Sequence, residues 1–85
     1  MTDRRNVWDQ LRKLTPARLA AAIEKDGGIF EGRAGAVRAY RYPDGRRVTV
    51  HFHLGKGYGP KLLKGLLERD LGWTEDDLRR LGLVD

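Results

Sequence analysis

The amino-acid sequence predicts an α+β fold in which helices pack on one face of a three-stranded antiparallel sheet. Apolar residues recur at helical spacing before residue 28 and after residue 60. Residues 29–53, in contrast, are rich in β-branched and aromatic residues and contain clear turn signals. The predicted order is helix, three strands, helix, with an extra short helix at each end. At 85 residues, we expect a single domain over residues 1–85.

Two helices are predicted in the first third of the chain. A short amphipathic helix is expected over residues 4–13, within an N-terminal extension of residues 1–13, because apolar residues recur there at helical spacing. Those residues are Val7, Trp8, Leu11 and Leu14. In the second helix, Thr15 has the residue type of an N-cap and Pro16 suits the first helical position. Gly27 and Gly28 provide the left-handed cap that ends it.

The first strand is expected to be short. Ile29 and Phe30 begin an extended segment, and Gly32 and Gly35 are expected to bracket a turn around Arg33. The second and third strands follow, rich in β-branched and aromatic residues, over residues 37–42 and 46–53. Pro43-Asp44-Gly45 between them is typical of a three-residue hairpin loop with a bulge, because proline presets the first turn angle and glycine takes the left-handed position.

The hairpin loop determines which residues face each other across the two strands. A three-residue loop pairs Tyr42 with Arg46 and Val37 with His51, whereas a two-residue loop would place His51 opposite Arg38. Alternation along the third strand holds in either case and predicts a core face and a face open to solvent. The core face has Val48, Val50 and Phe52. The open face has Arg47, Thr49, His51 and His53, joined across the hairpin by Val37, Ala39 and Arg41.

Two more helices are predicted after the glycine-rich loop of residues 54–59. The first begins at Pro60, ends at Gly72 and is expected to bury four leucines. Those leucines are Leu62, Leu63, Leu66 and Leu67. Thr74 is expected to cap the last helix, which precedes the apolar residues that pack it on the core. These residues are Leu78, Leu81 and Leu83.

Composition excludes several classes of function. The chain has no cysteine, which excludes disulfides, thiolate zinc sites and a cysteine nucleophile. No apolar run approaches the ~20 residues of a membrane span, and the polar start lacks an apolar signal core, so we expect a cytoplasmic protein without membrane contact. The formal net charge of +5 and the pI near 10.0 favour an anionic partner.

The two histidines are the candidate chemical groups. His51 and His53 stand two residues apart on a strand whose open face also holds Arg41 and Arg47. Imidazole can transfer a proton near neutral pH, and arginine can bind a phosphate. The same spacing could hold a metal, but without a placed carboxylate or cysteine it makes a weak site, so neither a metal nor a cofactor is predicted. From spacing alone, two solvated histidines on an exposed face are the alternative.

The loop Gly55-Lys56-Gly57-Tyr58-Gly59 resembles a phosphate cradle only superficially. It lacks the spacing and the terminal Lys-Ser/Thr of a P-loop, so a flexible turn is predicted. Lys56 and Lys61 nevertheless lie near the positive end of the following helix, which suits an anion.

The chain resembles the HicA (YcfA-like) toxin family over residues 14–83. The most specific part of the resemblance is Tyr-Arg-Tyr-Pro-Asp-Gly-Arg-Arg-Val-Thr-Val, residues 40–50. The segment from Leu14 to Gly28 and the later one from Pro60 to Leu67 also fit. The resemblance implies a fold similar to a double-stranded-RNA-binding domain, a ribonuclease that cuts messenger RNA, and neutralisation by a partner antitoxin, HicB.

One departure from the family pattern concerns the catalytic residue. The family has Gly-Ser-His where this chain has Gly35-Ala36-Val37, so valine occupies the position of the catalytic histidine. The family also usually has Pro-x-His where this chain has His51-Phe52-His53. Because a three-residue loop makes Val37 and His51 cross-strand neighbours, we expect the catalytic imidazole at His51, with His53 as a second proton-transfer group. A metal-independent attack by the ribose 2′-hydroxyl fits the lack of carboxylates expected around this face.

The expected RNA-binding residues are Arg33, Arg41, Arg47, Lys56 and Lys61. Two other functions remain open from the sequence. A family member that lost its histidine would be a non-catalytic module that binds RNA or an antitoxin. A small structural partner in a protein complex would have no affinity for RNA at moderate salt.

Overall fold

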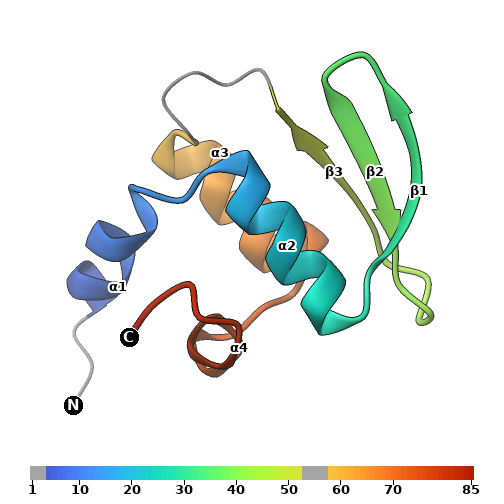
Figure 1. Ribbon diagram of the computed structural model, residues 1–85. Helices are drawn as coiled ribbons and strands as arrows, with labels where there is room; N and C mark the ends of the chain where they lie inside the picture. The colour runs from blue at the N-terminus through green and yellow to red at the C-terminus, as the bar shows by residue number, and fades with distance from the viewer. Residues whose placement is uncertain (1–3, 53–57) are drawn as a thin grey trace.

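The computed structural model describes residues 4–52 and 58–85, and it confirms the predicted α+β fold with a three-stranded antiparallel sheet. The helices lie together on one side of the sheet, and its other side has no described element over it (Figure 1). The elements in chain order are α1 (Arg4–Leu11), α2 (Pro16–Asp26), β1 (Ile29–Ala34), β2 (Val37–Arg41), β3 (Arg47–His51), α3 (Pro60–Lys64), η1 (Gly65–Asp70) and α4 (Glu75–Arg80).

Helix α2 has both predicted caps. The Thr15 side chain accepts a hydrogen bond from the Arg18 backbone N–H at 3.2 Å, which satisfies one of the free donors in the first turn. Gly27 ends the helix with φ +112°, a backbone conformation that residues with a Cβ rarely adopt. Leu19 and Ile23, one helical turn apart, are completely buried. The capped helix thus presents an apolar stripe to the sheet.

The hairpin between β2 and β3 has the predicted three-residue loop. The Tyr42 N–H donates to the Arg46 carbonyl at 2.8 Å, and Gly45, at φ +97°, donates to the Tyr42 carbonyl at 3.0 Å. The loop fixes the register, in which Val37 is paired with His51. The two-residue alternative is therefore excluded, and the predicted cross-strand pair is confirmed.

The predicted turn around Arg33 is wrong. Strand β1 continues through Ala34, and a two-residue turn of Gly35 and Ala36 joins it to β2. Gly35 has φ +59°, which explains why a glycine stands at this point. The sequence has two glycines near this turn, and only the second one marks it.

A bulge in β1 decides which face of the sheet Arg33 occupies. The register of β1 against β2 shifts by one residue at Glu31. Without the shift, Arg33 would stand opposite Val37 on the same face as His51. With it, Arg33 is paired with Arg38 and shares the helix-covered side of the sheet. One extra residue thus separates Arg33 from the other predicted RNA-binding arginines.

The helix predicted to begin at Pro60 is confirmed, but one of its predicted core residues is not buried. It begins at Pro60 as α3 and continues as η1, a wider π-helical segment, and Gly72 follows with φ +67°. Leu62 is 52% exposed. Leu62 therefore lies at the edge of the apolar face and not within it. The three buried leucines are Leu63, Leu66 and Leu67.

The core lies between the sheet and the helices. Tyr40 and Tyr42, whose alternation with arginines resembles a nucleic-acid platform, are 1% and 3% exposed and are packing residues. Phe52 is half-buried against the same core. The remaining core side chains come from all of the described helices, from β3 and from the segments that connect or follow these elements. They include the predicted Leu78, Leu81 and Leu83 of the last helical segment.

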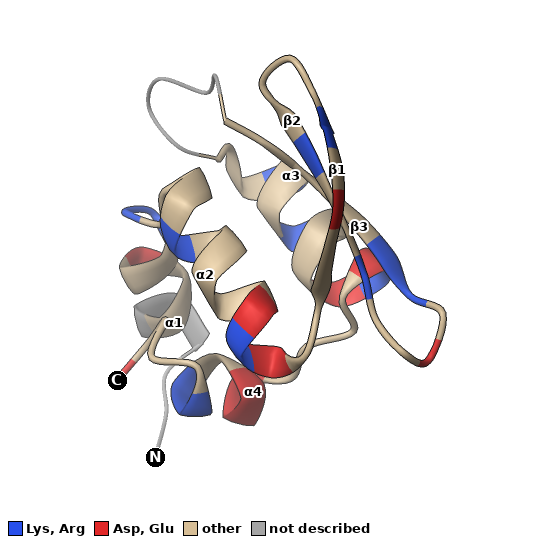
Figure 2. Cartoon of the chain, turned by 45° about the vertical axis from the view of Figure 1, so that its right-hand side comes forward, with Lys and Arg blue, Asp and Glu red and all other residues tan. Residues whose placement is uncertain are grey.

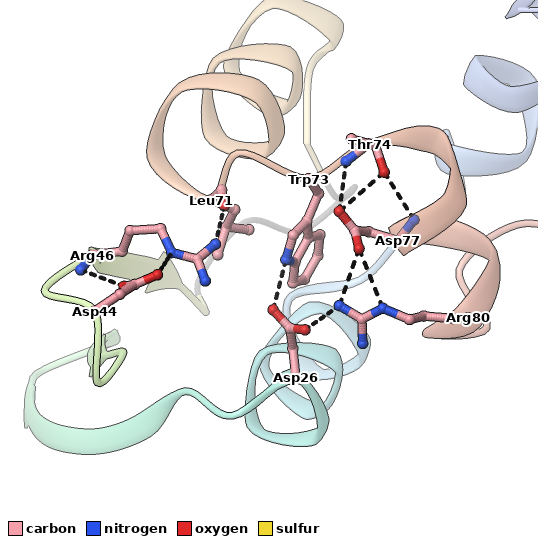
Figure 3. Close-up of polar contacts among 8 residues, drawn as sticks. All are labelled: Asp26, Asp44, Arg46, Leu71, Trp73, Thr74, Asp77 and Arg80. Atoms are coloured by element: carbon pink, nitrogen blue, oxygen red, sulfur yellow. Dashed lines mark hydrogen bonds and ion pairs between the residues drawn. The ribbon is translucent and has the colours of Figure 1, made fainter.

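A polar cluster joins the C-terminal segment to the end of α2 (Figure 3). The Trp73 indole N–H donates to Asp26 at 2.9 Å, and Arg80 donates to the second oxygen of the same carboxylate. Thr74 and Asp77 form a reciprocal capping box at the start of α4. Burial opposes ionisation of Asp26, but the hydrogen bonds from Arg80 and Trp73 outweigh it, and the pKa of Asp26 lies below its usual value.

Candidate nucleic-acid interface

The open face of the sheet is the side that faces away from the helices (Figures 1 and 2). Val48 and Val50 on β3 are 2% and 0% exposed, whereas Arg47 and Thr49, which alternate with them, are exposed. The predicted alternation is therefore confirmed for the described residues of this strand. The open face includes Ile29, Glu31, Val37, Ala39, Arg41, Arg47, Thr49 and His51.

Glu31 is the residue of this face that sequence reasoning missed. Its carboxylate accepts a hydrogen bond from Arg41 Nε at 2.5 Å and lies 3.2 Å from Arg47 Nε. The hydrogen bond from Arg41 is the main reason that the pKa of Glu31 lies below its usual value. The expectation of a face without carboxylates is therefore wrong. A signal existed, because two-residue alternation from Ile29 places Glu31 on the face of Arg41.

The ion pairs change the electrostatics of the open face. Arg41 and Arg47 are direct cross-strand partners, and two like charges in that position repel each other. One carboxylate between them relieves the repulsion and leaves a net charge of +1 for the three groups. Both arginine side chains remain more than half exposed, at 55% and 61%. They can therefore still exchange Glu31 for a phosphate.

His51 stands at the end of β3, half-buried, with Val37 as its partner on β2. Directly opposed residues in an antiparallel pair have Cβ atoms about 4.5–5.5 Å apart, so the two positions occupy nearly the same place on the open face. Tyr58 lies close to the His51 backbone. Burial raises the pKa of Tyr58 to about 12, and the His51 backbone amide partly opposes this rise. The Tyr58 hydroxyl is buried without a hydrogen bond of standard geometry.

The structure brings together three of the seven predicted site residues. Arg41, Arg47 and His51 share the open face. Arg33 lies on the helix-covered side of the sheet. Lys61 is exposed on α3, which is one of the helices on that same side. His53 and Lys56 lie outside the described residues. The candidate site is therefore a histidine at the end of β3, together with the cross-strand pair of Arg41 on β2 and Arg47 at the start of β3.

The described part of the chain offers neither a metal cluster nor a membrane-spanning helix. Within residues 4–52 and 58–85, no three histidine, cysteine, aspartate or glutamate side chains are grouped so that they could hold a metal ion. Among the same residues, no helix has the length and apolar character needed to cross a membrane.

Comparison with known families identifies the class of protein. A family model described as the HicA toxin of bacterial toxin–antitoxin matches residues 17–73, which is more than half of the chain. The match runs from the start of α2 to Trp73, so it includes the whole sheet and leaves out α1 and α4. The chain is therefore a toxin-type protein of such a system, and it belongs to the HicA toxin family. Membership implies an antitoxin partner. A search of curated proteins gives no match.

Proposed function

We propose that this protein is the toxin of a type II toxin–antitoxin system and cleaves messenger RNA on the open face of its sheet. The observation that supports the proposal most strongly is the cross-strand pairing of Val37 with His51. The family resemblance places a catalytic histidine at position 37, and the register brings the His51 imidazole to the same place from the neighbouring strand. We infer from this pairing that the catalytic imidazole has moved across the hairpin.

The proposed reaction uses the RNA's own nucleophile. The His51 imidazole takes the proton of a ribose 2′-hydroxyl, and the 2′-oxygen attacks the adjacent phosphorus. The bond to the 5′-oxygen breaks, and that oxygen leaves with a proton from a second group, for which His53 is the candidate two residues further along. The products are a 2′,3′-cyclic phosphate and a 5′-hydroxyl. This chemistry requires no metal and no cofactor.

Arg41 and Arg47 lie too far from His51 to contact the phosphate that is cleaved, so we propose that they bind another part of the RNA. Arg47 precedes His51 by four residues on β3, which separates their Cα atoms by about 13 Å. Arg41 is directly opposite Arg47 and equally far away. We therefore assign both arginines to a flanking phosphate of the RNA. Charge stabilisation at the cleaved phosphate is assigned to Lys56, which follows His51 by five residues.

The direct test is a single substitution with a matched control on the same strand. His51→Ala should abolish cleavage of single-stranded RNA and growth arrest on induction, while RNA binding is retained. Thr49→Ala removes an exposed side chain from the same face and should leave cleavage unchanged. The product carrying a 2′,3′-cyclic phosphate is identified by mass spectrometry. Full activity of folded His51→Ala would refute the assignment of the base.

A second candidate function has its own supporting observation. Valine at position 37 cannot transfer a proton, and Glu31 neutralises part of the open face. Both features suit a family member that binds RNA or its antitoxin without cleaving. Such a protein would bind single-stranded RNA in a salt-dependent way, yield no cyclic phosphate and cause no growth arrest. The product assay separates the two functions.

The partner and the location follow from the same proposal. A HicB-like antitoxin is the proposed inhibitor, and the cytoplasm, where messenger RNA is available, is the proposed location. Co-expression with the protein encoded beside this one should relieve growth arrest, and copurification would identify the complex. Growth arrest that persists with a folded neighbouring protein present would rule that protein out as the antitoxin.

A further inference from the structure

A hollow of about 530 Å³ lies on the helix-covered side of the sheet. Its walls come from α2, β1 and β2, and it is lined by Glu24, Phe30, Arg33, Arg38 and Tyr40. Figure 2 shows basic segments of β1 and β2 next to each other. The volume falls within the range of pockets that hold small organic ligands. The proposed cleavage site does not use this hollow.

The two arginines of the hollow form a pair that has no ion-pair partner among the described residues. Arg33 and Arg38 are direct cross-strand neighbours, so their like charges oppose each other. In the described part of the chain, neither has an acidic partner within ion-pair distance, in contrast to the arginines of the open face. The Arg38 guanidinium lies 4.2 Å from the centre of the Phe52 ring, which orients it. An anion bound between the two arginines would relieve their repulsion.

Phe30 adds an aromatic surface to the same hollow. The residue is 51% exposed. It meets the buried Tyr40 ring edge to face, with the centroids 5.8 Å apart and the planes at 68°. The contact fixes the orientation of the Phe30 ring and leaves part of it accessible. An exposed, oriented aromatic ring beside arginines is the arrangement on which unpaired nucleobases stack.

Glu24 bears on whether the hollow suits an acidic peptide or a nucleotide. Its carboxylate lines the hollow from α2 and accepts hydrogen bonds only. An acidic peptide brings further carboxylates, which Glu24 repels. A nucleotide brings a phosphate for the arginines together with donors on its ribose and its base, which a carboxylate can accept. The mixture of charges therefore favours a nucleotide over an acidic protein segment.

We propose that the hollow is a subsite that binds one unstacked nucleotide of single-stranded RNA. Arg33 and Arg38 hold its phosphate, and its base stacks on Phe30. The subsite rests on the proposed ribonuclease function and extends it to a specific part of the substrate. Arg38 is paired with Val50, the residue before His51 on β3. RNA that passes over the Gly35–Ala36 turn reaches both the subsite and the imidazole.

The test measures binding of a fluorescent single-stranded oligonucleotide of about twelve nucleotides to the full-length protein. Its riboses are 2′-O-methylated, so that it cannot be cleaved. The double variant Arg33→Gln/Arg38→Gln is compared with Arg12→Gln/Arg69→Gln, which loses the same charge at side chains that are 78% and 81% exposed elsewhere. The subsite variant should lose at least about tenfold in affinity and lower the slope of log K against log salt by about 0.7–1.4. The control should remain within about twofold.

The aromatic part of the subsite is tested separately. Phe30→Ala should lose about five- to hundredfold in affinity, whereas Phe30→Tyr should retain it. On an oligonucleotide with abasic sites, Phe30→Ala should bind as the wild type does, because no base remains to stack. Leu62→Ala, at an apolar residue of α3 that is 52% exposed away from both faces of β1, is the control for loss of an apolar side chain.

The outcomes separate the subsite from the function on which it rests. If the wild type binds and cleaves RNA while the subsite variants do so equally well, the subsite is refuted and the proposed function stands. If the folded wild type neither binds nor cleaves single-stranded RNA, the proposed function is refuted and the subsite with it. Circular dichroism confirms that each variant is folded.

Discussion

Replacement of Glu31 by glutamine should strengthen RNA binding by this protein. In the structure, the Glu31 carboxylate contacts both Arg41 and Arg47, at 2.5 and 3.2 Å. The substitution removes the negative charge and releases both guanidinium groups for phosphate. Because the ion pairs are exposed, the fold should not depend on them. The expected change is therefore in affinity, with the stability nearly unaffected.

The size of the effect follows from counterion release. For single-stranded nucleic acid, each phosphate contact adds about 0.7 to the slope of log K against log salt. Relative to 1 M salt, one new contact at 0.1 M therefore raises affinity about fivefold, and two contacts raise it about 25-fold. The slope itself should become steeper by about 0.7–1.4.

The assay is a salt titration of RNA binding by fluorescence anisotropy. Glu68→Gln is the matched control, because it changes the net charge equally at an exposed position of η1 away from the open face. Equal effects of Glu31→Gln and Glu68→Gln would refute the reasoning. In that case, the open-face arginines would not contact RNA, and only the overall charge would matter.

Two further predictions concern the polar cluster at the end of α2. Asp26→Asn should lower the free energy of unfolding by about 1.5–3 kcal/mol in a urea titration, because it weakens the hydrogen bonds from Trp73 and Arg80 to a mostly buried carboxylate. The control is Asp76→Asn, at a side chain that is 97% exposed, which should change the free energy of unfolding little. Acid should also destabilise the fold. The pKa of Asp26 is lowered against burial by Arg80 and Trp73, and that of Asp77 is lowered first by the Thr74 backbone amide. The two carboxylates contribute their full stabilisation at a pH above their unfolded pKa of 3.8, and this stabilisation is lost as the pH falls through their lower folded pKa values. At a pH below about 4 the melting temperature should therefore decrease, and it should decrease less in Asp26→Asn. A melting temperature independent of pH in this range would contradict the role of the cluster.

The hairpin that carries His51 was predictable because its register depends on local chemistry. Pro43-Asp44-Gly45 specifies a three-residue loop, and that loop determines every pair along β2 and β3. The caps of α2 were predictable for the same reason, since Thr15 and Gly27 act through neighbouring backbone groups. Such features need no knowledge of the rest of the chain.

The course of β1 was not predictable in the same way. The bulge at Glu31 is compatible with the packing of Phe30 on Tyr40 and with the contact to Arg41, and each contact joins residues about ten positions apart. No local pattern specifies which residue of a strand is extra. The consequence for the site is large, because the bulge moves Arg33 to the other face of the sheet and into the hollow.

The same limit applies to the C-terminal segment. Trp73 and Arg80 meet Asp26 across 47 and 54 positions of sequence, and their residue types alone suggest solvent-exposed groups or packing. The caps and the leucines of α4 were predictable, whereas the cluster that docks the segment required the tertiary structure. Long-range polar contacts thus account for most of what sequence reasoning missed.

The most direct test of the central claim exchanges the two residues of the cross-strand pair. His51→Val alone should abolish cleavage of single-stranded RNA. The double variant His51→Val/Val37→His returns an imidazole to the same place on the open face from the other strand, so it should restore cleavage with a 2′,3′-cyclic phosphate product. Retained cleavage in His51→Val, or a folded double variant that binds RNA without cleaving it, would contradict the claim that the catalytic imidazole has moved across the hairpin.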